Sequence, residues 1–409
     1  MKVIKTSIVA ALAALGLAAA QPGAAQTAAL KASDNVIRIG LLSDLAGPTS
    51  DYSGQGAIEA VKLAIADMGG KINGVPIEFI YADHQNKPDV AVAKAREWFD
   101  TGKVDMVLGL SGSPAALGVI EVARAKKKIT ITTAAGTTRI TNEACSPYSM
   151  HWVFDAYALA SAPATAITKA GGNTWFLLVG DFAYGLAVEK SVVSAITAAG
   201  GKVVGTAKHP FVANDFSSLA LEAVNSKAKV IGLSNSSADT TNSIRALKEF
   251  GLGKDQTVVA FTILLNEIHG LGLESTQGLQ FVDAFYWDRT PESRAFSKRF
   301  AEKIKRPPNM INAGDYSATL SYLKAVQAAG TDDPDGVMKK MHELPVNDVF
   351  ASNGQVRADG RMVHDMYLVE VKKPSESKYP WDYLKVRQTI PGAQAFMPIE
   401  MSQCALVKK

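Results

Sequence analysis

Cysteine is scarce in this chain, and long apolar runs and clusters of one charge are few. Cys145 and Cys404 are the two cysteines among 409 residues, and no histidine is grouped beside either, so they carry no metal-binding signature. The longest basic run, residues 126–128, is typical of a solvated helix end and too short for a nucleic-acid surface. Beyond the N-terminus, no apolar run approaches the length of a membrane span. We therefore expect neither a nucleic-acid partner nor an integral membrane protein.

The signature motifs of common enzymes and cofactor sites are also missing. The histidines form no HxH or HxxxH pair, and neither a GxGxxG motif opening a helix after the first strand nor a GxxxxGK[ST] motif occurs. Residues 109–113 superficially suggest a nucleophilic serine at Ser111, but the glycine that a nucleophile elbow needs two residues later is lacking. The sequence therefore predicts no enzyme, no metal and no cofactor.

The N-terminus has the pattern of a secretory signal peptide. Two lysines precede an apolar run at residues 8–20, and small residues follow it. We predict removal of residues 1–25 and a periplasmic location, and we favour this over an uncleaved anchor. In that oxidising compartment, a disulfide between Cys145 and Cys404 is favoured over two unpaired buried thiols.

Length and hydrophobic periodicity predict two α/β lobes. The chain exceeds one average domain, and strands alternate with amphipathic helices over residues 36–138. The same alternation returns over residues 157–285. Each repeat is long enough for a doubly wound lobe, in which helices cover both faces of a mostly parallel sheet. The tail after residue 373 is rich in proline and aromatic residues, and we expect it to wrap the fold without regular structure.

Two neighbouring strand ends of the first lobe open onto small and hydroxyl-bearing residues. One strand is followed by Ser111-Gly112-Ser113, with Ser113 as the predicted N-cap and Pro114 as the first residue of a helix. The next strand ends in residues 134–138, which are all alanine, glycine or threonine. Ligands of open α/β sheets bind at such strand ends, and free N–H groups at a helix start favour an anion such as a carboxylate. The alternative is that these turns are small for packing alone.

Several segments, in their order along the chain, resemble the periplasmic leucine/isoleucine/valine-binding proteins: residues 36–48 with Tyr52, 74–77, 109–138, 181–185 and 214–217. The resemblance covers nearly all of the mature chain. It implies two doubly wound parallel-sheet lobes, joined by three hinge crossovers, that close on a small ligand and deliver it to an inner-membrane ABC permease. We expect a monomer with lobe 1 at 35–153 and 284–350, lobe 2 at 154–283 and 351–376, and a wrapping tail at 377–409.

The resemblance also implies which positions hold the ligand. The positions that hold the ligand's carboxylate match a hydroxyl-bearing turn, Ser111 with Ser113 close by, and the next strand end, Ala134, Gly136 and Thr137. The aromatic wall, formed by both lobes, matches Tyr52 and Tyr184. The hinge-side positions match Asn235 and Thr262.

The amino-acid binders of this family hold the ligand's ammonium group with an acidic residue, and this chain departs from that pattern. Thr262 aligns with the acidic position and Asn235 with a neighbouring aromatic one. A buried ammonium without a counter-charge costs a few kcal/mol or more. Residues 285–288 also resemble the family's aromatic-acid branch, so we predict a carboxylate without an α-amino group, such as a benzoate- or cinnamate-like acid. A branched-chain amino acid remains the alternative, because one of three other acids could reach an ammonium: Asp155, Asp239 or Glu267.

Two further functional classes stay open as alternatives. A ligand-sensing regulatory domain can share this fold, although the chain carries no DNA-binding or signalling segment. A secreted hydrolase acting through Ser111 would have to turn over an ester or an amide.

Overall fold

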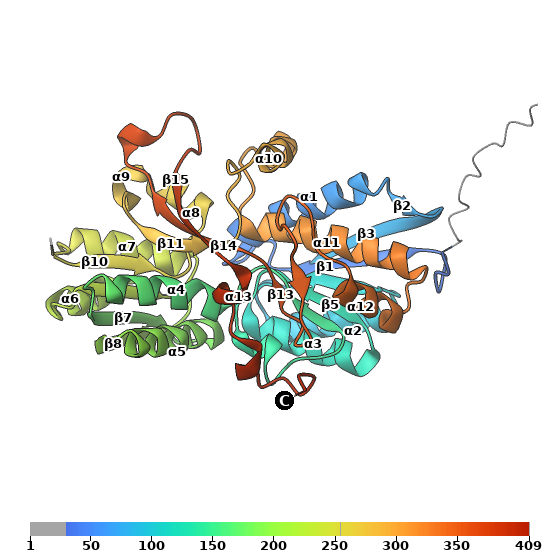
Figure 1. Ribbon diagram of the computed structural model, residues 1–409, viewed down its shortest axis with the longest axis horizontal. Helices are drawn as coiled ribbons and strands as arrows, with labels where there is room; N and C mark the ends of the chain where they lie inside the picture. The colour runs from blue at the N-terminus through green and yellow to red at the C-terminus, as the bar shows by residue number, and fades with distance from the viewer. Residues whose placement is uncertain (1–29, 254, 409) are drawn as a thin grey trace, which may run out of the picture.

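Two α/β lobes lie side by side in the computed structural model, which describes residues 30–253 and 255–408 (Figure 1). Lobe 1 is on the right of Figure 1 and lobe 2 is on the left. Each lobe is built on a mainly parallel sheet, so the predicted fold class is confirmed. The predicted signal peptide, residues 1–25, lies outside the described residues.

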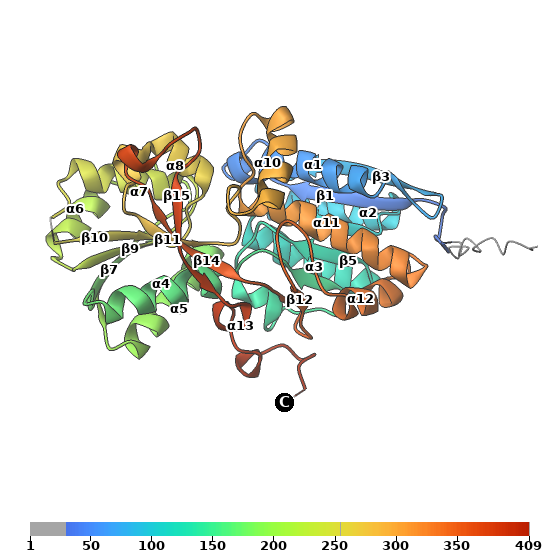
Figure 2. The ribbon, with the colours of Figure 1, turned by 45° about the horizontal axis from the view of Figure 1, so that its top comes forward.

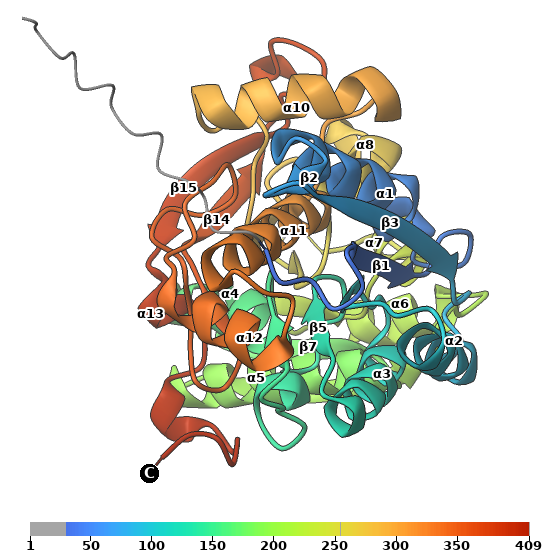
Figure 3. The same cartoon turned by 90° about the vertical axis from the view of Figure 1, so that its right-hand side faces the viewer.

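Lobe 1 contains a six-stranded sheet in the order β2-β3-β1-β4-β5-β6, parallel except for the β2–β3 pair. Residues of β1 alternate between its faces: Leu42 packs with α2 and α3, whereas Ile39 and Leu41 pack with α1 and α11. Figure 3 shows these helix pairs on opposite sides of the sheet. The elements are β1 (Ile37–Ser43), β2 (Lys71–Ile72), β3 (Val75–Asp83), β4 (Met106–Gly109), β5 (Ile129–Thr132), β6 (Ser149–His151), α1 (Ser50–Asp67), α2 (Pro88–Asp100), α3 (Ser113–Lys126), α10 (Pro291–Ile304), α11 (Met310–Ala329) and α12 (Pro334–Glu343).

Lobe 2 contains a four-stranded parallel sheet in the order β10-β9-β7-β8. Along β7, Leu177 packs with α4 and α5, and Leu178 packs with α6 and α7, so both faces are covered (Figure 2). The elements are β7 (Thr174–Gly180), β8 (Lys202–His209), β9 (Val230–Ser234), β10 (Thr257–Ala260), α4 (Ala156–Lys169), α5 (Ala183–Ala198), α6 (Ser217–Asn225), α7 (Ala238–Glu249), α8 (Leu265–Leu271) and α9 (Leu273–Thr276).

Small antiparallel sheets complete the fold around the crossovers. A three-stranded sheet adds β11 (Gln280–Asp283), β14 (Met366–Val371) and β15 (Leu384–Ile390) to lobe 2, and a hairpin is formed by β12 (Gln355–Val356) and β13 (Met362–Val363). The chain passes between the lobes after β6, after β11 and after β13. These passages hold the open strand ends of the two sheets toward each other.

The structure differs from the expected boundaries in the C-terminal quarter. The β12–β13 hairpin was expected in lobe 2, but β12 contacts α12 and Arg361 pairs with His151 of β6, both in lobe 1. The tail was expected to lack regular structure, but β15 pairs along its length with β14. The first difference comes from the bridge between His151 and Arg361, which are far apart in sequence, and the second from pairing of β15 with β14, the preceding strand; neither pairing is specified by local propensity.

The end of the tail is attached to lobe 1. Cys145 and Cys404 form a disulfide with their Cα atoms 5.6 Å apart. Next to it, the Ser402 hydroxyl donates to the Thr141 carbonyl at 3.0 Å. After β15 in lobe 2 the chain therefore returns to lobe 1, and its C-terminal end is fixed there (Figure 2).

Candidate ligand-binding site

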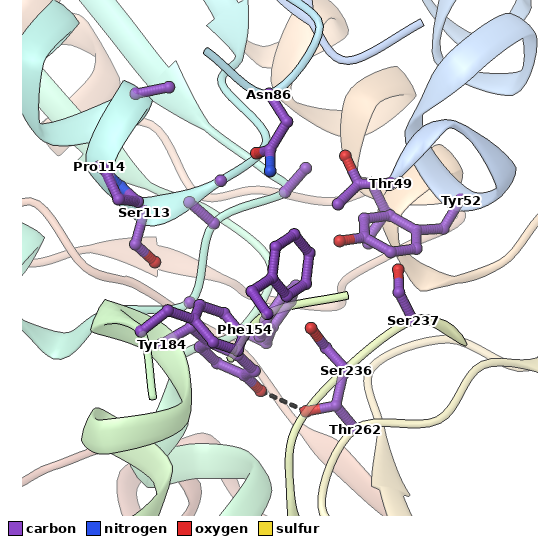
Figure 4. A pocket seen from close by; sticks show the side chains of 18 of the residues that line it. Thr49, Tyr52, Asn86, Ser113, Pro114, Phe154, Tyr184, Ser236, Ser237 and Thr262 are labelled. Carbon is purple, nitrogen blue, oxygen red and sulfur yellow. Dashed lines mark hydrogen bonds between the residues drawn. The ribbon is translucent and has the colours of Figure 1, made fainter. Parts of the chain in front are cut away.

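A cavity of about 120 Å³ lies between the two lobes, at the strand ends of both sheets. It has room for on the order of ten water-sized groups, which is the size of a small metabolite. Its wall is formed by Thr49, Tyr52, Asn86, Pro88, Gly112, Ser113, Pro114, Ala115, Ala134, Ala135, Gly136, Phe154, Phe182, Tyr184, Phe211, Ser236, Ser237, Thr262, Leu264, Glu267, Met310 and Ile311 (Figure 4). This wall contains no lysine, arginine or histidine, and Glu267 is its one acidic residue.

The start of α3 supplies a polar corner of the cavity. The helix begins at Ser113 with Gly112 as its N-cap, at a φ of 80° that favours glycine, so the prediction of Ser113 as the N-cap is wrong. Ser113 is only 2% exposed. Its hydroxyl does not cap the helix and has no hydrogen-bond partner. The first N–H groups of a helix also lack partners within the helix. This corner therefore offers donors to a ligand and is electrostatically suited to an anion.

The turn after β5 brings the two lobes into contact. A Cβ atom on Gly136 would lie 2.4 Å from Cε2 of Tyr184 and 2.7 Å from Cε2 of Phe154, so the two rings pack directly on this glycine. The Gly136 carbonyl also accepts a hydrogen bond from Ala156 N, the first residue of α4, at 2.8 Å. The turn that borders the cavity in lobe 1 thus touches lobe 2 through backbone and aromatic rings.

Aromatic rings form much of the apolar wall. Phe154 and Tyr184 meet edge to face with ring centroids 6.3 Å apart, and Phe182 and Phe211 lie 4.6 Å apart. Tyr52 faces them from the first turn of α1 (Figure 4). Edge-to-face and offset arrangements of this kind also suit a ligand ring placed between them.

Hydroxyl groups line the lobe 2 side of the cavity. The hydroxyls of Tyr184 and Thr262 are hydrogen-bonded to each other, and the Ser237 hydroxyl donates across the gap to the Pro48 carbonyl at 3.1 Å. Burial raises the pKa of both Tyr52 and Tyr184 far above the usual tyrosine range, so both remain neutral phenols. Contacts that run from one lobe to the other show that this is a closed form.

Glu267 is the acidic group of the wall, and it lies in the first turn of α8. One carboxyl oxygen accepts from Leu264 N at 2.8 Å, and the residue is 8% exposed. Burial, with a smaller contribution from the nearby charge of Asp51, raises the pKa of Glu267 to about 8, although the hydrogen bond from Leu264 N opposes the shift. Without ligand, this carboxyl is therefore mostly protonated at neutral pH. Asp155 and Asp239, the other acids considered for an ammonium, do not line the cavity.

Comparison with known proteins identifies this two-lobed arrangement. The model of the periplasmic binding protein family matches residues 36–378. The chain belongs to this family. The resemblance found in the sequence is thereby confirmed, and the Leu/Ile/Val-binding protein homolog 6 of Brucella suis is 24% identical over 90% of this chain and 96% of its own.

Solved structures show the same fold, two of them at higher identity. A periplasmic binding protein from Burkholderia mallei is 49% identical, covers 92% of this chain and 100% of its own, and superposes with a TM-score of 0.89. A branched chain amino acid ABC transporter periplasmic ligand-binding protein from Burkholderia xenovorans LB400 is 38% identical over 90% of this chain and 99% of its own, with a TM-score of 0.82. A solute binding protein of an R. palustris ABC transporter in complex with benzoate, 22% identical over 90% and 99% of the chains with a TM-score of 0.79, shares the fold.

Six of the nine positions that the sequence assigned to ligand binding lie in the wall of this periplasmic binding protein: Tyr52, Ser113, Ala134, Gly136, Tyr184 and Thr262. Their role in binding remains a prediction. They reach the wall because the carboxyl ends of parallel strands and the starts of the following helices meet at one edge of each sheet.

Three expected contact residues lie behind the wall instead. The Ser111 hydroxyl is fully buried and accepts from Asp44 N at 2.7 Å, and Thr137 caps the turn at Arg139 N. The Asn235 amide donates to Ser243 at 3.0 Å and accepts from Thr240 at 2.8 Å. In this form the three side chains brace the loops that carry the wall, and a role for these residues in ligand binding stays a prediction.

The sequence reasoning missed much of the lobe 2 side of the wall. Ser236 and Ser237 lie in the short turn between β9 and α7, with Ser237 as the N-cap of α7, so the strand-end rule that located Ser113 in lobe 1 would have found them. Phe154 lies in the passage between β6 and α4, and no local pattern marks it.

Clusters of other kinds are not found in the described part of the chain. No group of three or more histidine, cysteine, aspartate or glutamate residues is placed to hold a metal ion there. None of the helices at residues 30–253 and 255–408 has the length and apolarity to cross a membrane.

Proposed function

We propose that this protein captures a small carboxylate, preferentially an aromatic acid, between its two lobes and delivers it to an ABC permease without a catalytic step. The observation that carries the proposal is the unpartnered, buried Ser113 hydroxyl at the start of α3, in a cavity with no basic side chain. An anion there would be stabilised by hydrogen-bond donors and the positive end of the helix, not by an ion pair.

The shape and chemistry of the remaining wall support an aromatic body for this acid. Five aromatic side chains, of Tyr52, Phe154, Phe182, Tyr184 and Phe211, line a cavity that holds about ten water-sized groups. Benzoate is of that size, and its ring can contact edges and faces of these side chains. The R. palustris protein bound to benzoate shows that the fold can enclose such a ligand.

A branched-chain or related amino acid is the second candidate, and Glu267 is the observation that favours it. Its carboxyl group lies in the wall and, once ionised, could hold an ammonium group. The Burkholderia xenovorans relative is described as a branched chain amino acid ABC transporter periplasmic ligand-binding protein, which also supports this candidate. Against it stands the cost of ionising a carboxyl group with a pKa of about 8.

Other parts of the proposal follow from the family. We propose that the mature chain acts in the periplasm as a monomer, after removal of residues 1–25. A hydrolase acting through Ser111 is disfavoured because that hydroxyl is 0% exposed and bonded to Asp44 N.

Binding of a panel of ligands to the purified mature protein tests the proposal. Thermal-shift and calorimetric titrations would compare benzoate, 4-hydroxybenzoate and cinnamate with L-leucine, L-isoleucine and L-valine. A ligand in excess stabilises the folded protein by RT ln(1 + [L]/Kd), so the preferred class gives the largest shift. Aromatic acids should bind more tightly; tighter binding of the amino acids favours the second candidate, and no binding by any carboxylate refutes the function.

Ser113→Ala tests the anion corner. Loss of a hydrogen bond to a charged group costs about 1.5–3 kcal/mol, so affinity for the best carboxylate should fall by roughly tenfold to a hundredfold. Ser297→Ala is a matched control, because Ser297 is also a buried serine without a partner but lies in α10, away from the cavity. Equal affinities of the two variants would remove Ser113 from the site.

A further inference from the structure

Glu267 has no cationic side chain beside it in the cavity wall, and the Leu264 N–H is the group that partly offsets a negative charge on it. Its carboxyl group lies in the cavity wall, where no lysine, arginine or histidine is present. The charged or titratable groups that act on it or lie beside it are Asp51 and Tyr52 of α1 and Tyr184 of α5. Asp51 is acidic and repels a second negative charge, and the two phenols are neutral. A buried carboxylate without a cationic partner is costly by several kcal/mol, so this arrangement favours the protonated acid.

The protonated acid has a hydrogen to donate. One of its oxygens already accepts from Leu264 N, which fixes the carboxyl group at the start of α8. A neutral carboxyl group keeps one O–H donor in addition to its acceptor capacity. Because Glu267 is only 8% exposed, a donor that faces the ligand is best satisfied by a ligand oxygen.

The position of Glu267 separates it from the anion corner. Asn266, the residue before Glu267, is hydrogen-bonded to Asp51 of α1, and Tyr52 of α1 lies across the cavity from Ser113 (Figure 4). A carboxylate at Ser113 would therefore point the other end of the ligand toward the α1 and α8 side.

We propose that Glu267 recognises the ligand as a neutral carboxylic acid, donating its proton to a second oxygen at the end remote from the ligand's carboxylate. The inference rests on the proposed function and narrows the substrate class to carboxylates with a distal oxygen, such as a ring hydroxyl, and without an ammonium group. Ligand affinity then depends on whether the Glu267 carboxyl group is protonated.

The two roles of Glu267 predict opposite pH dependences. The pKa of Glu267 is about 8 because of burial. If the acid binds as a donor, affinity is constant well below pH 8 and falls by up to tenfold per pH unit above it, because the ionised form must take up a proton. If it binds an ammonium group, the ionised form is required, so affinity rises toward pH 8 and binding releases a proton.

A matched pair of ligands tests the donor role in the wild-type protein. 4-Hydroxybenzoate and 4-methylbenzoate differ in the distal oxygen, and calorimetry at pH 6.5 should show the hydroxylated acid binding at least tenfold more tightly. Equal affinities would overturn the inference while leaving the proposed function intact. Failure of every carboxylate in the panel would refute the proposed function itself, and this inference with it.

The variant Glu267→Gln tests whether Glu267 binds the ligand in its protonated form. The amide is neutral at all pH values and can donate a hydrogen bond, so 4-hydroxybenzoate should bind within about threefold of wild type at pH 6.5. The wild-type affinity divided by the variant affinity should fall about fourfold between pH 6.5 and pH 8.5, and this ratio cancels ionisation of the ligand. Glu274→Gln, an exposed change in the adjacent α9, is the control and should follow wild type.

The opposite results would assign Glu267 to an ammonium group. In the first of these results, Glu267→Gln would lose more than tenfold in affinity for L-leucine. In the second, the wild-type protein would bind L-leucine more tightly at pH 8.5 than at pH 6.5. The ligand pair and the wild-type pH series do not require a variant to fold, so the inference stands or falls on them even if Glu267→Gln is unstable.

Discussion

Position 136 carries a glycine where the two lobes touch, and the absence of a side chain there has a direct consequence. The Tyr184 and Phe154 rings occupy the space that a Cβ atom would need. Gly136→Ala should therefore push Tyr184 of lobe 2 away from the turn and disfavour closure. Overpacking of this kind costs about 1–3 kcal/mol, so we expect ligand affinity to fall by roughly fivefold to a hundredfold, as measured by calorimetry.

A second glycine provides the control for this change. A Cβ atom on Gly270, in α8, would meet no atom within 4 Å, so Gly270→Ala should leave affinity close to wild type. Small-angle scattering should show a larger radius of gyration with ligand for Gly136→Ala than for Gly270→Ala. Full affinity in Gly136→Ala would mean that the contact with Tyr184 is not needed for closure.

Residue chemistry also marks the limit of what the sequence could predict about the site. The topology rule placed a hydroxyl-rich turn at the cavity, but it could not tell which serine faces inward. That choice depends on the φ of 80° at Gly112, which starts the helix at Ser113 and leaves Ser111 behind the wall. Glu267 was considered only as an alternative, because its neighbours in sequence say nothing about its burial.

Among the secondary-structure elements, the N-terminal ends of helices supply much of the cavity wall. The N-terminal ends of α1, α3, α5, α7, α8 and α11 all contribute residues to the cavity wall or flank it. The strand–helix alternation predicted most of these helices. It missed α8, which has 7 residues and is too short for a clear apolar period.

Three of these helix starts are linked by Asn266 of α8. Its amide donates to Asp51 of α1 in lobe 1, and its carbonyl oxygen accepts from Asn309, the N-cap of α11, at 3.3 Å. Asn266 does not line the cavity, so these bonds act on closure and not on the ligand. Asn266→Ala should weaken affinity about tenfold, because a hydrogen bond to a charged group contributes about 1.5–3 kcal/mol.

Stopped-flow kinetics can locate the effect of Asn266→Ala. The loss should appear as faster dissociation, since the bonds between lobes form after the ligand has entered the open form. Asn242→Ala, on the exposed side of α7 in the same lobe, removes only a contact with Arg245 and is the control. An unchanged dissociation rate in Asn266→Ala would exclude this link from closure.

Over the whole molecule, two repeats of strand–helix alternation were enough to predict two lobes, and the family resemblance implied a ligand site between them. The sequence did not predict that residues 355–363 stay with lobe 1, nor that β15 joins the sheet of lobe 2. The first depends on a contact between Arg361 and the distant His151, and the second on pairing of β15 with the preceding strand β14, which local patterns do not specify.

The return of the tail leads to a prediction about the stability of the whole fold. The disulfide joins residues 259 positions apart, so in the loop-entropy model it destabilises the unfolded chain by about 5.6 kcal/mol, an upper bound because real unfolded chains retain structure. Cys145→Ser with Cys404→Ser should lower the midpoint of urea unfolding markedly. It should also free the tail beyond Phe396, whose ring packs under the Arg361 guanidinium at 4.4 Å, for limited proteolysis.

The control for the disulfide keeps the covalent link and removes a neighbouring contact. Ser402→Ala loses one hydrogen bond, from the hydroxyl to the Thr141 carbonyl, so it should cost only about 1 kcal/mol and leave the tail resistant to protease. Since the tail comes from lobe 2 and ends on lobe 1, cutting the disulfide removes the covalent attachment of its end but leaves the passages after β6, β11 and β13 intact. The double variant should therefore still bind ligand. Loss of binding at a temperature where the variant remains folded would show that the tail also controls closure.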